Sequence, residues 1–186
     1  MKIDKESGIF LHKNEKEGKK GKIDLPLAEA INEMFDRDFL VDLGCSTGKY
    51  CKFFDEKGWI VQGYEGNPYI SDFKVFPYVQ IMDLSVPQKT LPVDLVICLE
   101  VGEHVPYPRM KVFLDNVIGF TGEWLVLSWA VPGQGGTGHV NEMSNMDIIN
   151  EVEKRGLKFD SEKSKKLRAA ASFRWFKNTV MVFNYA

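Results

Sequence analysis

Short apolar runs alternate with amphipathic stretches along most of this chain. The runs typical of buried strands cover residues 39–43, 59–65, 78–83, 95–99, 123–130, 157–159 and 179–186. The clearest helical periodicity covers residues 107–120, with apolar side chains on one face at Met110, Phe113, Leu114, Val117 and Ile118. This alternation predicts an α/β fold with a mostly parallel sheet. The last two runs lack a full-length crossover helix between them, so we expect them to form an antiparallel pair at one edge.

Capping signals locate several helix ends. Asp24 is a suitable N-cap for a helix predicted within residues 23–36. Ser144 with Asp147 indicates a capping box at the start of a later helix. Gly58 stands where the helix after the first strand should end.

The N-terminal segment differs from the rest of the chain. Residues 1–22 are charged and contain few apolar side chains apart from Ile9, Phe10 and Leu11. We expect a mobile arm over residues 1–22 and a single domain over residues 23–186. The arm is either a solvated tail or a lid that closes over a ligand.

The rest of the chain is organised around residues 39–48, FLVDLGCSTG. The pattern predicts a buried parallel strand, a tight loop and the start of a helix. Such a helix presents free N–H groups and a positive dipole end to a ligand. Gly44, Ser46 and Gly48 would let that ligand approach the backbone closely.

Acidic side chains lie at the carboxyl ends of four of the predicted strands. They are Asp42, Glu65, Asp83 and Glu100. Ligands of open α/β sheets bind at the carboxyl ends of the strands, so we expect these acids to converge there. Glu65 lies about twenty residues past the glycine loop, where an acid accepts hydrogen bonds from a ribose diol. The four acids together favour a nucleoside-type site.

The loop itself restricts the ligand. A dinucleotide site needs G-x-G-x-x-G, whereas here Gly44, Ser46 and Gly48 are each two residues apart. A Walker phosphate loop needs a hydroxyl residue after its Gly-Lys pair, and here Tyr50 follows Lys49. No basic residue except Lys49 is near the loop. The site therefore suits a ligand that is nucleoside-like, cationic and free of phosphate.

These motifs resemble those of the class I S-adenosylmethionine-dependent methyltransferases. VDLGCSTG resembles the first motif of that family, although Ser46 replaces its middle glycine, and GYEGNP resembles the ribose motif. IMDLSVP matches the adenine-contacting position, and DLVICLEVGEHVP resembles the fourth motif of the small-molecule branch. The resemblance covers at least residues 38–130 in the same motif order.

The resemblance implies a Rossmann-like, seven-stranded, mostly parallel sheet with an antiparallel last strand and helices on both faces. It also implies S-adenosyl-L-methionine as cofactor. Glu65 would then hold the ribose hydroxyls, and Asp83 with Leu84 would hold the adenine. The implied contacts of the methionine half come from Asp42 and the loop of Gly44, Ser46 and Gly48, with Glu100 near the amino group.

Candidates for contacting or deprotonating the methyl acceptor are Glu103, His104 and His139. Glu103 and His104 follow the fourth strand, and His139 lies in the glycine-rich loop after the fifth. His12, in the arm, is a weaker candidate. A metal site from Glu103, His104 and His139 is conceivable because imidazole and carboxylate suit zinc or iron, but no ligand spacing enforces it, so we predict no metal. Trp129, at the end of the fifth strand, is a candidate for the acceptor pocket.

Composition adds little beyond this picture. The chain has 186 residues, a net charge of −2 and three cysteines without metal spacing. We expect reduced cysteines, a cytoplasmic location and no membrane segment. The charge makes a nucleic-acid partner unlikely, although residues 163–177 are basic with interleaved aromatic side chains.

The leading hypothesis is a methyltransferase that acts on a small molecule. The alternatives are an RNA or protein methyltransferase, a non-catalytic cofactor-binding protein and a nicotinamide-dependent oxidoreductase. The sequence does not identify the acceptor or the oligomeric state.

Overall fold

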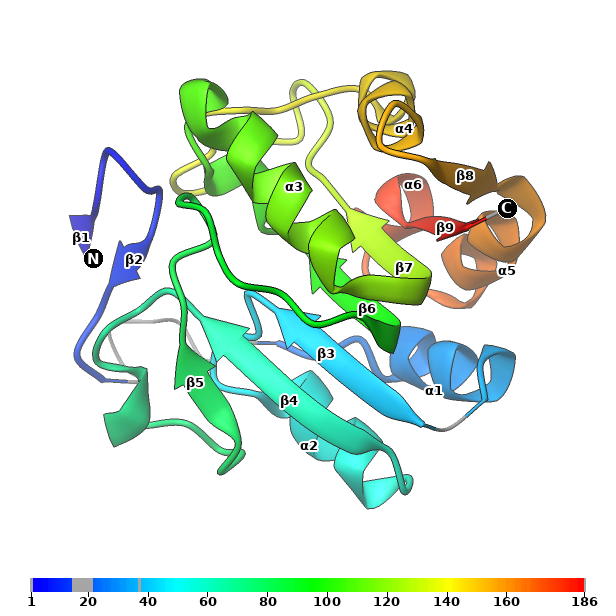
Figure 1. The fold of residues 1–186 in the computed structure, drawn as a ribbon, viewed down its shortest axis with the longest axis horizontal. Helices are drawn as coiled ribbons and strands as arrows, with labels where there is room; N and C mark the ends of the chain where they lie inside the picture. Colours follow the sequence, from blue (N-terminus) through cyan, green and yellow to red (C-terminus); the bar gives the residue numbers. More distant parts are fainter. Residues whose placement is uncertain (1, 15–21, 37, 186) are drawn as a thin grey trace.

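A seven-stranded sheet forms the centre of the computed structural model, which describes residues 2–14, 22–36 and 38–185 (Figure 1). Its strand order is β5-β4-β3-β6-β7-β9-β8. The bounds are β3 Phe39–Leu43, β4 Ile60–Glu65, β5 Val79–Ile81, β6 Val93–Leu99, β7 Thr121–Ser128, β8 Leu157–Asp160 and β9 Met181–Tyr185. All seven predicted strands are present, and β5 ends two residues before Asp83 rather than at it.

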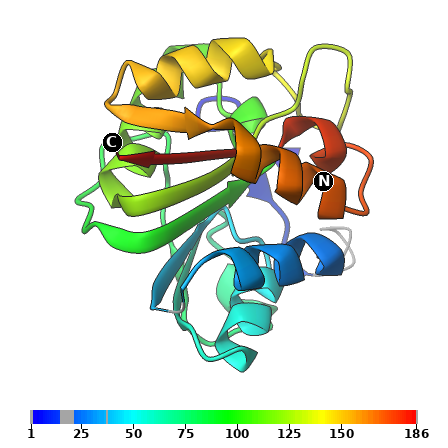
Figure 2. The same cartoon turned by 90° about the vertical axis from the view of Figure 1, so that its right-hand side faces the viewer.

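Helices cover both faces of this sheet, as predicted (Figures 1 and 2). One face packs against α3 and α4, and the other packs against α1, α2, α5 and α6. Their bounds are α1 Leu25–Met34, α2 Lys49–Glu56, α3 Met110–Phe120, α4 Asn145–Glu153, α5 Ser161–Ala170 and α6 Phe176–Thr179. None of these helices, within the described ranges, is both long enough and apolar enough to cross a bilayer.

The central strands β3 and β6 are mostly apolar because both of their faces are buried. Neighbouring residues of β3 show this: Leu40 packs into the core beneath α1 and α2, and Val41 packs into the core beneath α3. Ile97 and Cys98 of β6 divide between the two cores in the same way. A continuous apolar run is therefore the sequence signal of these central strands.

The C-terminal strands refine the prediction of an antiparallel edge pair. β8 and β9 do pair antiparallel, with Phe159 opposite Phe183. β9 also pairs antiparallel with β7, with Leu125 opposite Phe183. β9 therefore lies inside the sheet, and β8 forms the edge.

The predicted caps are confirmed by their hydrogen bonds. The Asp24 carboxylate accepts the N–H of Leu27, and the Ser144 hydroxyl accepts the N–H of Asp147. Asp24 is fully buried, and it also accepts the backbone N–H groups of Ser172 and Phe173 at 2.8 and 2.6 Å. This N-cap therefore joins α1 to the segment that follows α5.

The N-terminal segment forms a short hairpin of β1 (Lys2–Ile3) and β2 (Phe10–Leu11). It lies beyond the carboxyl ends of β3 and β4 (Figure 1). Residues 15–21 of the predicted arm lie outside the described residues. The mobility of the arm and its role as a lid stay predictions.

Candidate active site

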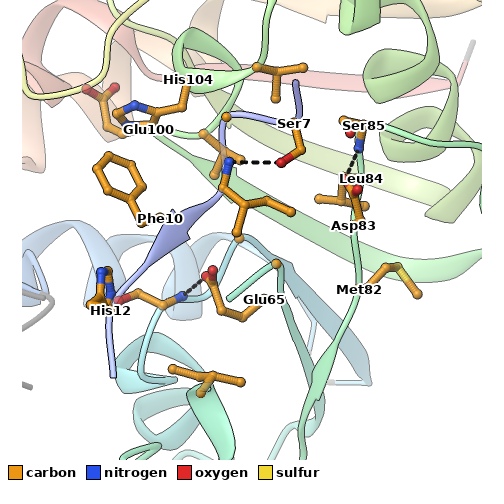
Figure 3. Close-up of a pocket in the computed structure, with 18 residues that line it drawn as sticks. Ser7, Phe10, His12, Glu65, Met82, Asp83, Leu84, Ser85, Glu100 and His104 are labelled. Atoms are coloured by element: carbon orange, nitrogen blue, oxygen red, sulfur yellow. Dashed lines mark hydrogen bonds between the residues drawn. The ribbon is translucent and has the colours of Figure 1, made fainter. Parts of the chain in front are cut away.

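A cavity lies where the strand order reverses, between β3 and β6. Open α/β sheets bind ligands at this switch point because the connections leave the two strands in opposite directions. The cavity has a volume of about 270 Å³. Its walls come from the loops after β3, β4, β5 and β6 and from the N-terminal hairpin (Figure 3).

Glu65 stands at the centre of the cavity wall. Its Oε2 accepts the backbone N–H of Ser46 at 2.9 Å, and its Oε1 accepts the N–H of Asn67 at 3.0 Å. These bonds hold the carboxylate in one orientation. Burial raises the pKa of Glu65 above its ordinary value. Because a carboxylate oxygen can accept more than one hydrogen bond, Glu65 can still bind a pair of ligand hydroxyls.

The glycine loop meets the cavity through Gly44 and Ser46 but not through Gly48. Gly44 has φ +75°, and a Cβ there would collide with the side chain of Val101, so the loop needs glycine at this position. Ser46 adopts the left-handed region at φ 52°. Gly48 has φ +84° and packs against Phe76, where a Cβ would come within 2.9 Å of the Phe76 Cβ. Its function is thus to turn the chain into α2.

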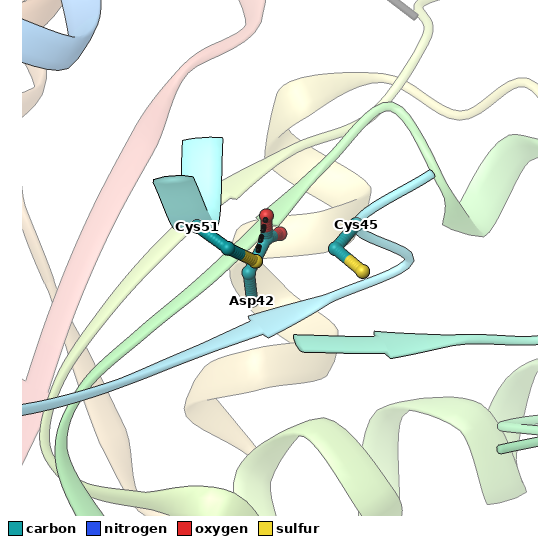
Figure 4. Close-up of side chains that lie close together, drawn as sticks. All are labelled: Asp42, Cys45 and Cys51. Carbon is teal, nitrogen blue, oxygen red and sulfur yellow. Dashed lines mark hydrogen bonds between the residues drawn. The ribbon is translucent and has the colours of Figure 1, made fainter. Parts of the chain in front are cut away.

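Asp42 is buried beneath this loop and does not line the cavity. The Cys51 thiol of α2 donates to its Oδ2 at 3.4 Å, and Cys45 lies close by (Figure 4). Burial raises the pKa of Asp42 to about 7. Asp42 therefore contacts Cys51 of α2 instead of the cavity where the ligand was expected. Its side chain points towards α2, the helix that covers this face of β3.

Asp83 and Leu84, which the resemblance assigns to adenine, also line the cavity. The Asp83 carboxylate accepts the N–H of Ser85 at 2.8 Å. Asn116 of α3 donates to the Leu84 carbonyl at 2.9 Å and thereby anchors the loop after β5. Sequence reasoning missed Asn116, although its polar side chain interrupts the apolar face of α3.

Glu100 lines the cavity directly after β6. Its backbone has φ 56°, which is rare for a residue other than glycine. The Ser128 hydroxyl donates to Oε1 at 2.8 Å, and the Gln134 amide donates to Oε2 at 2.6 Å. Burial raises its pKa. These donors hold the Glu100 carboxylate at the cavity wall, and its contact with the amino group of the ligand stays a prediction.

The three candidate catalytic residues lie together, although 35 positions separate His104 from His139 in the sequence. One ligand atom from each of Glu103, His104 and His139 lies within 4.8 Å of the others. Of the three, His104 alone lines the cavity. Burial lowers the pKa of His104 to about 4, so its imidazole is neutral near neutral pH. Burial raises the pKa of Glu103 well above its usual range.

The N-terminal hairpin completes the cavity. Ser7, Ile9, Phe10 and His12 line it, and the Phe10 ring packs edge-on against the His104 ring at 4.8 Å. The sequence singled out only His12 here as a site residue. The apolar group at Ile9 and Phe10, within an otherwise polar arm, was the available signal.

Charge distinguishes this cavity from a phosphate site. Three carboxylates line it, those of Glu65, Asp83 and Glu100, and none of the described lining residues is Lys or Arg. Trp129 does not contribute: it is fully buried, packs against Phe113 and donates to the Asn141 carbonyl at 2.6 Å. The expectation that Trp129 lines an acceptor pocket is therefore wrong, because its strand runs into the core beneath α3.

Comparisons with known proteins agree with this fold. No protein-family model and no curated protein sequence matches the chain. Its structure is similar to that of the sugar N-methyltransferase KedS8 from Streptoalloteichus, with a TM-score of 0.69 and 13% identity over 90% of each chain. A TehB-like SAM-dependent methyltransferase from Corynebacterium glutamicum matches with a TM-score of 0.66 and 21% identity over 91% of this chain and 92% of that one.

The magnesium protoporphyrin IX methyltransferase of Synechocystis, solved with bound SAH, is also similar. Its TM-score is 0.65 at 16% identity, over 88% of this chain and 81% of that chain. At these identities the likeness concerns the fold. The chain thus has the fold of the class I S-adenosylmethionine-dependent methyltransferases, as its motifs predicted.

Proposed function

We propose that this protein is an S-adenosylmethionine-dependent methyltransferase that acts on a small molecule. The carboxylates of Glu65, Asp83 and Glu100 on the cavity wall, together with the lack of Lys or Arg among its described lining residues, carry the proposal. A cationic sulfonium with an amino group is stabilised in such surroundings, whereas a pyrophosphate is repelled. The SAH-bound Synechocystis structure of the same fold supports it.

The residues of the cavity fit this cofactor. Glu65 would hold the ribose hydroxyls through the carboxylate that Ser46 and Asn67 orient. Adenine would lie against Leu84 and Asp83.

The methionine half would follow the loop of Gly44 and Ser46 towards Glu100, which would accept its amino group. Asp42 and Gly48 would act indirectly, by shaping that loop.

Alignment accounts for most of the chemistry. The bound cofactor supplies a sulfonium methyl group that is already electrophilic, so the protein mainly has to hold the acceptor in line with it. Such positioning contributes about 7–11 kcal/mol to lowering the barrier. Where the acceptor must lose a proton, neutral His104 is the candidate base. Its Nδ1 lies 3.2 Å from the Gly138 carbonyl, which can only accept, so Nε2 carries the lone pair.

The hairpin favours a small acceptor, because it covers the cavity that a polymer would have to enter. In the basic stretch proposed as an alternative RNA surface, two side chains are paired locally: Lys163 with Asp160, and Lys165 with Glu162. Cys45, Cys51 and Cys98 are all free and buried, which supports a reducing compartment such as the cytoplasm.

A thermal-shift titration with S-adenosylmethionine, S-adenosylhomocysteine and NADH in parallel tests the proposal. Ligand at about a hundred times its dissociation constant adds roughly 2.7 kcal/mol to the stability. We expect the two adenosyl ligands to raise the midpoint by roughly 5–10 °C and NADH to leave it unchanged. A shift with NADH alone would instead favour an oxidoreductase. Tight adenosyl binding without transfer to a broad panel of small acceptors would favour a non-catalytic binding protein.

A further inference from the structure

We propose that Glu103, His104 and His139 form a binding site for one divalent transition-metal ion at the edge of the cavity. The sequence predicted no metal, because these residues lack a recognisable ligand spacing. The fold nevertheless brings two imidazoles and one carboxylate together. Three further observations point to an ion there.

The first observation is the state of the Glu103 carboxylate. The side chain is fully buried, and neither of its oxygens has a hydrogen-bond partner among the described residues. The backbone N–H groups of Glu103 and Ala130 lie near the carboxylate, but neither reaches the distance and angle of a well-formed hydrogen bond to it. A buried carboxylate without donors is costly, and a bound cation would satisfy it.

The second observation is the orientation of His139. Its Nδ1 lies 2.9 Å from Oε1 of Glu142, and its Nε2 lies 3.9 Å from Oε1 of Glu103. The Glu142 carboxylate can only accept a hydrogen bond, so Nδ1 of His139 carries the hydrogen. The lone pair is then on Nε2, which faces Glu103. A carboxylate behind a histidine is the usual outer partner of a metal-binding imidazole.

The third observation is that the surrounding loops are built to hold both histidines. Glu142 also accepts the N–H groups of Gly133 and Gly135 at 2.8 and 2.9 Å, which folds the glycine-rich loop around His139. The Gly138 carbonyl faces Nδ1 of His104 at 3.2 Å and is a second outer partner of the kind that metal-binding histidines use. The glycine-rich loop after β7 thus orients both imidazoles.

A second buried group, Asp42 with Cys45 and Cys51, is a weaker candidate. The Cys51 thiol already donates to Asp42 at 3.4 Å, and the Cys45 thiol faces the Ser46 carbonyl at 3.7 Å. The groups therefore satisfy one another, and none needs an ion.

The donor set selects the ion. Two imidazoles and one carboxylate favour Mn²⁺, Fe²⁺, Co²⁺ or Zn²⁺ over Mg²⁺ or Ca²⁺, which prefer oxygen ligands alone. Because His104 belongs to both the site and the cavity wall, the ion would lie beside the bound acceptor. This last step rests on the proposed function: the acceptor would carry a hydroxyl or carboxylate oxygen that occupies an open position on the metal. The ion would also occupy Nε2 of His104, so His104 would act as a base only in the protein without metal.

Metal titration of the 186-residue protein tests the site. Protein freed of metal with a chelator is titrated with Co²⁺, followed by visible absorption, and with Mn²⁺ and Zn²⁺, followed by calorimetry. We expect one equivalent to bind. Glu103→Gln and His139→Ala should each weaken binding by at least about 100-fold, and Glu142→Gln, which removes only an outer partner, by about 10–100-fold.

The control is Glu56→Gln, which changes an exposed carboxylate of α2 in the same way and should leave metal affinity unchanged. The proposal would be overturned if the wild-type protein bound no stoichiometric metal. It would also be overturned if His139→Ala bound metal with unchanged affinity. The His139→Ala result is sufficient if Glu103→Gln does not fold. Binding of S-adenosylhomocysteine is measured on the same samples. If S-adenosylhomocysteine binds but metal does not, the metal site alone is refuted. If metal binds but S-adenosylhomocysteine does not, the methyl-donor site alone is refuted.

Discussion

The carboxylate of Glu65 at the end of β4 accepts the backbone N–H of Ser46, in the loop after β3, at 2.9 Å. This bond joins the two motifs of the candidate cofactor site across neighbouring parallel strands. It also explains how Ser46 is held in the left-handed conformation, at φ 52°, without being a glycine. The acid that should bind the ribose therefore also shapes the loop that should follow the methionine.

Glu65→Ala should raise the dissociation constant of S-adenosylhomocysteine by at least about tenfold, equivalent to about 1.4 kcal/mol. The variant loses both the acceptor for the ribose hydroxyls and the bond that orients the loop. Calorimetry measures the change, and Glu56→Ala, which alters an exposed glutamate of α2, is the control. An unchanged constant in Glu65→Ala would remove the ribose assignment.

Gly8→Ala tests whether the hairpin acts as a lid. Gly8 has φ +81°, and a Cβ there would collide with the backbone carbonyl of His104, so the hairpin cannot pack as it does. We expect weaker binding of S-adenosylhomocysteine and faster hydrogen exchange in residues 2–14. Gly58→Ala is the matched control, because Gly58 has φ +94° but no neighbour within 4 Å of an added Cβ. Equal binding by the two variants would show that the hairpin does not contribute to the site.

Asp42→Asn should change the pH dependence of stability. Burial raises the pKa of Asp42 from 3.8 to about 7, so the folded protein holds a proton that the unfolded chain releases. The stability that this proton confers is complete below about pH 4 and is lost as the pH rises towards about 7.

The Asn variant lacks this loss, so its stability relative to wild type should increase with pH, by up to about 1.4 kcal/mol per pH unit. Urea unfolding of both proteins at about pH 5 and about pH 8 measures the difference. A difference that does not change with pH would mean that Asp42 titrates normally.

Asp24→Ala should destabilise the protein by more than about 2 kcal/mol, beyond the effect of an ordinary N-cap. The buried carboxylate caps α1 and also accepts N–H groups from Ser172 and Phe173, which would be left without their acceptor. Ser144→Ala removes the N-cap of α4 alone and should cost about 1 kcal/mol. Equal losses in urea unfolding would show that the link from α1 to residues 172–173 contributes nothing.

Local pattern was sufficient for much of this protein. Strand and helix order, the N-caps at Asp24 and Ser144, and the acids after successive strands all follow from periodicity and side-chain chemistry over a few residues. The shared edge of parallel strands then brings Glu65, Asp83 and Glu100 to one cavity, because strands running the same way end on the same side.

Tertiary structure alone decided which side chains reach that cavity. Asp42 belongs to the same motif as Gly44, yet its side chain points towards α2, because Asp42 lies inside β3 beneath this helix, whereas Gly44 lies in the loop that follows the strand. The meeting of Glu103 with His139, and of Gly8 with His104, depends on the paths of two long loops and a distant hairpin. Contacts of this kind depend on how the elements pack in three dimensions, so they cannot be predicted from the pattern of residues that are neighbours in the sequence.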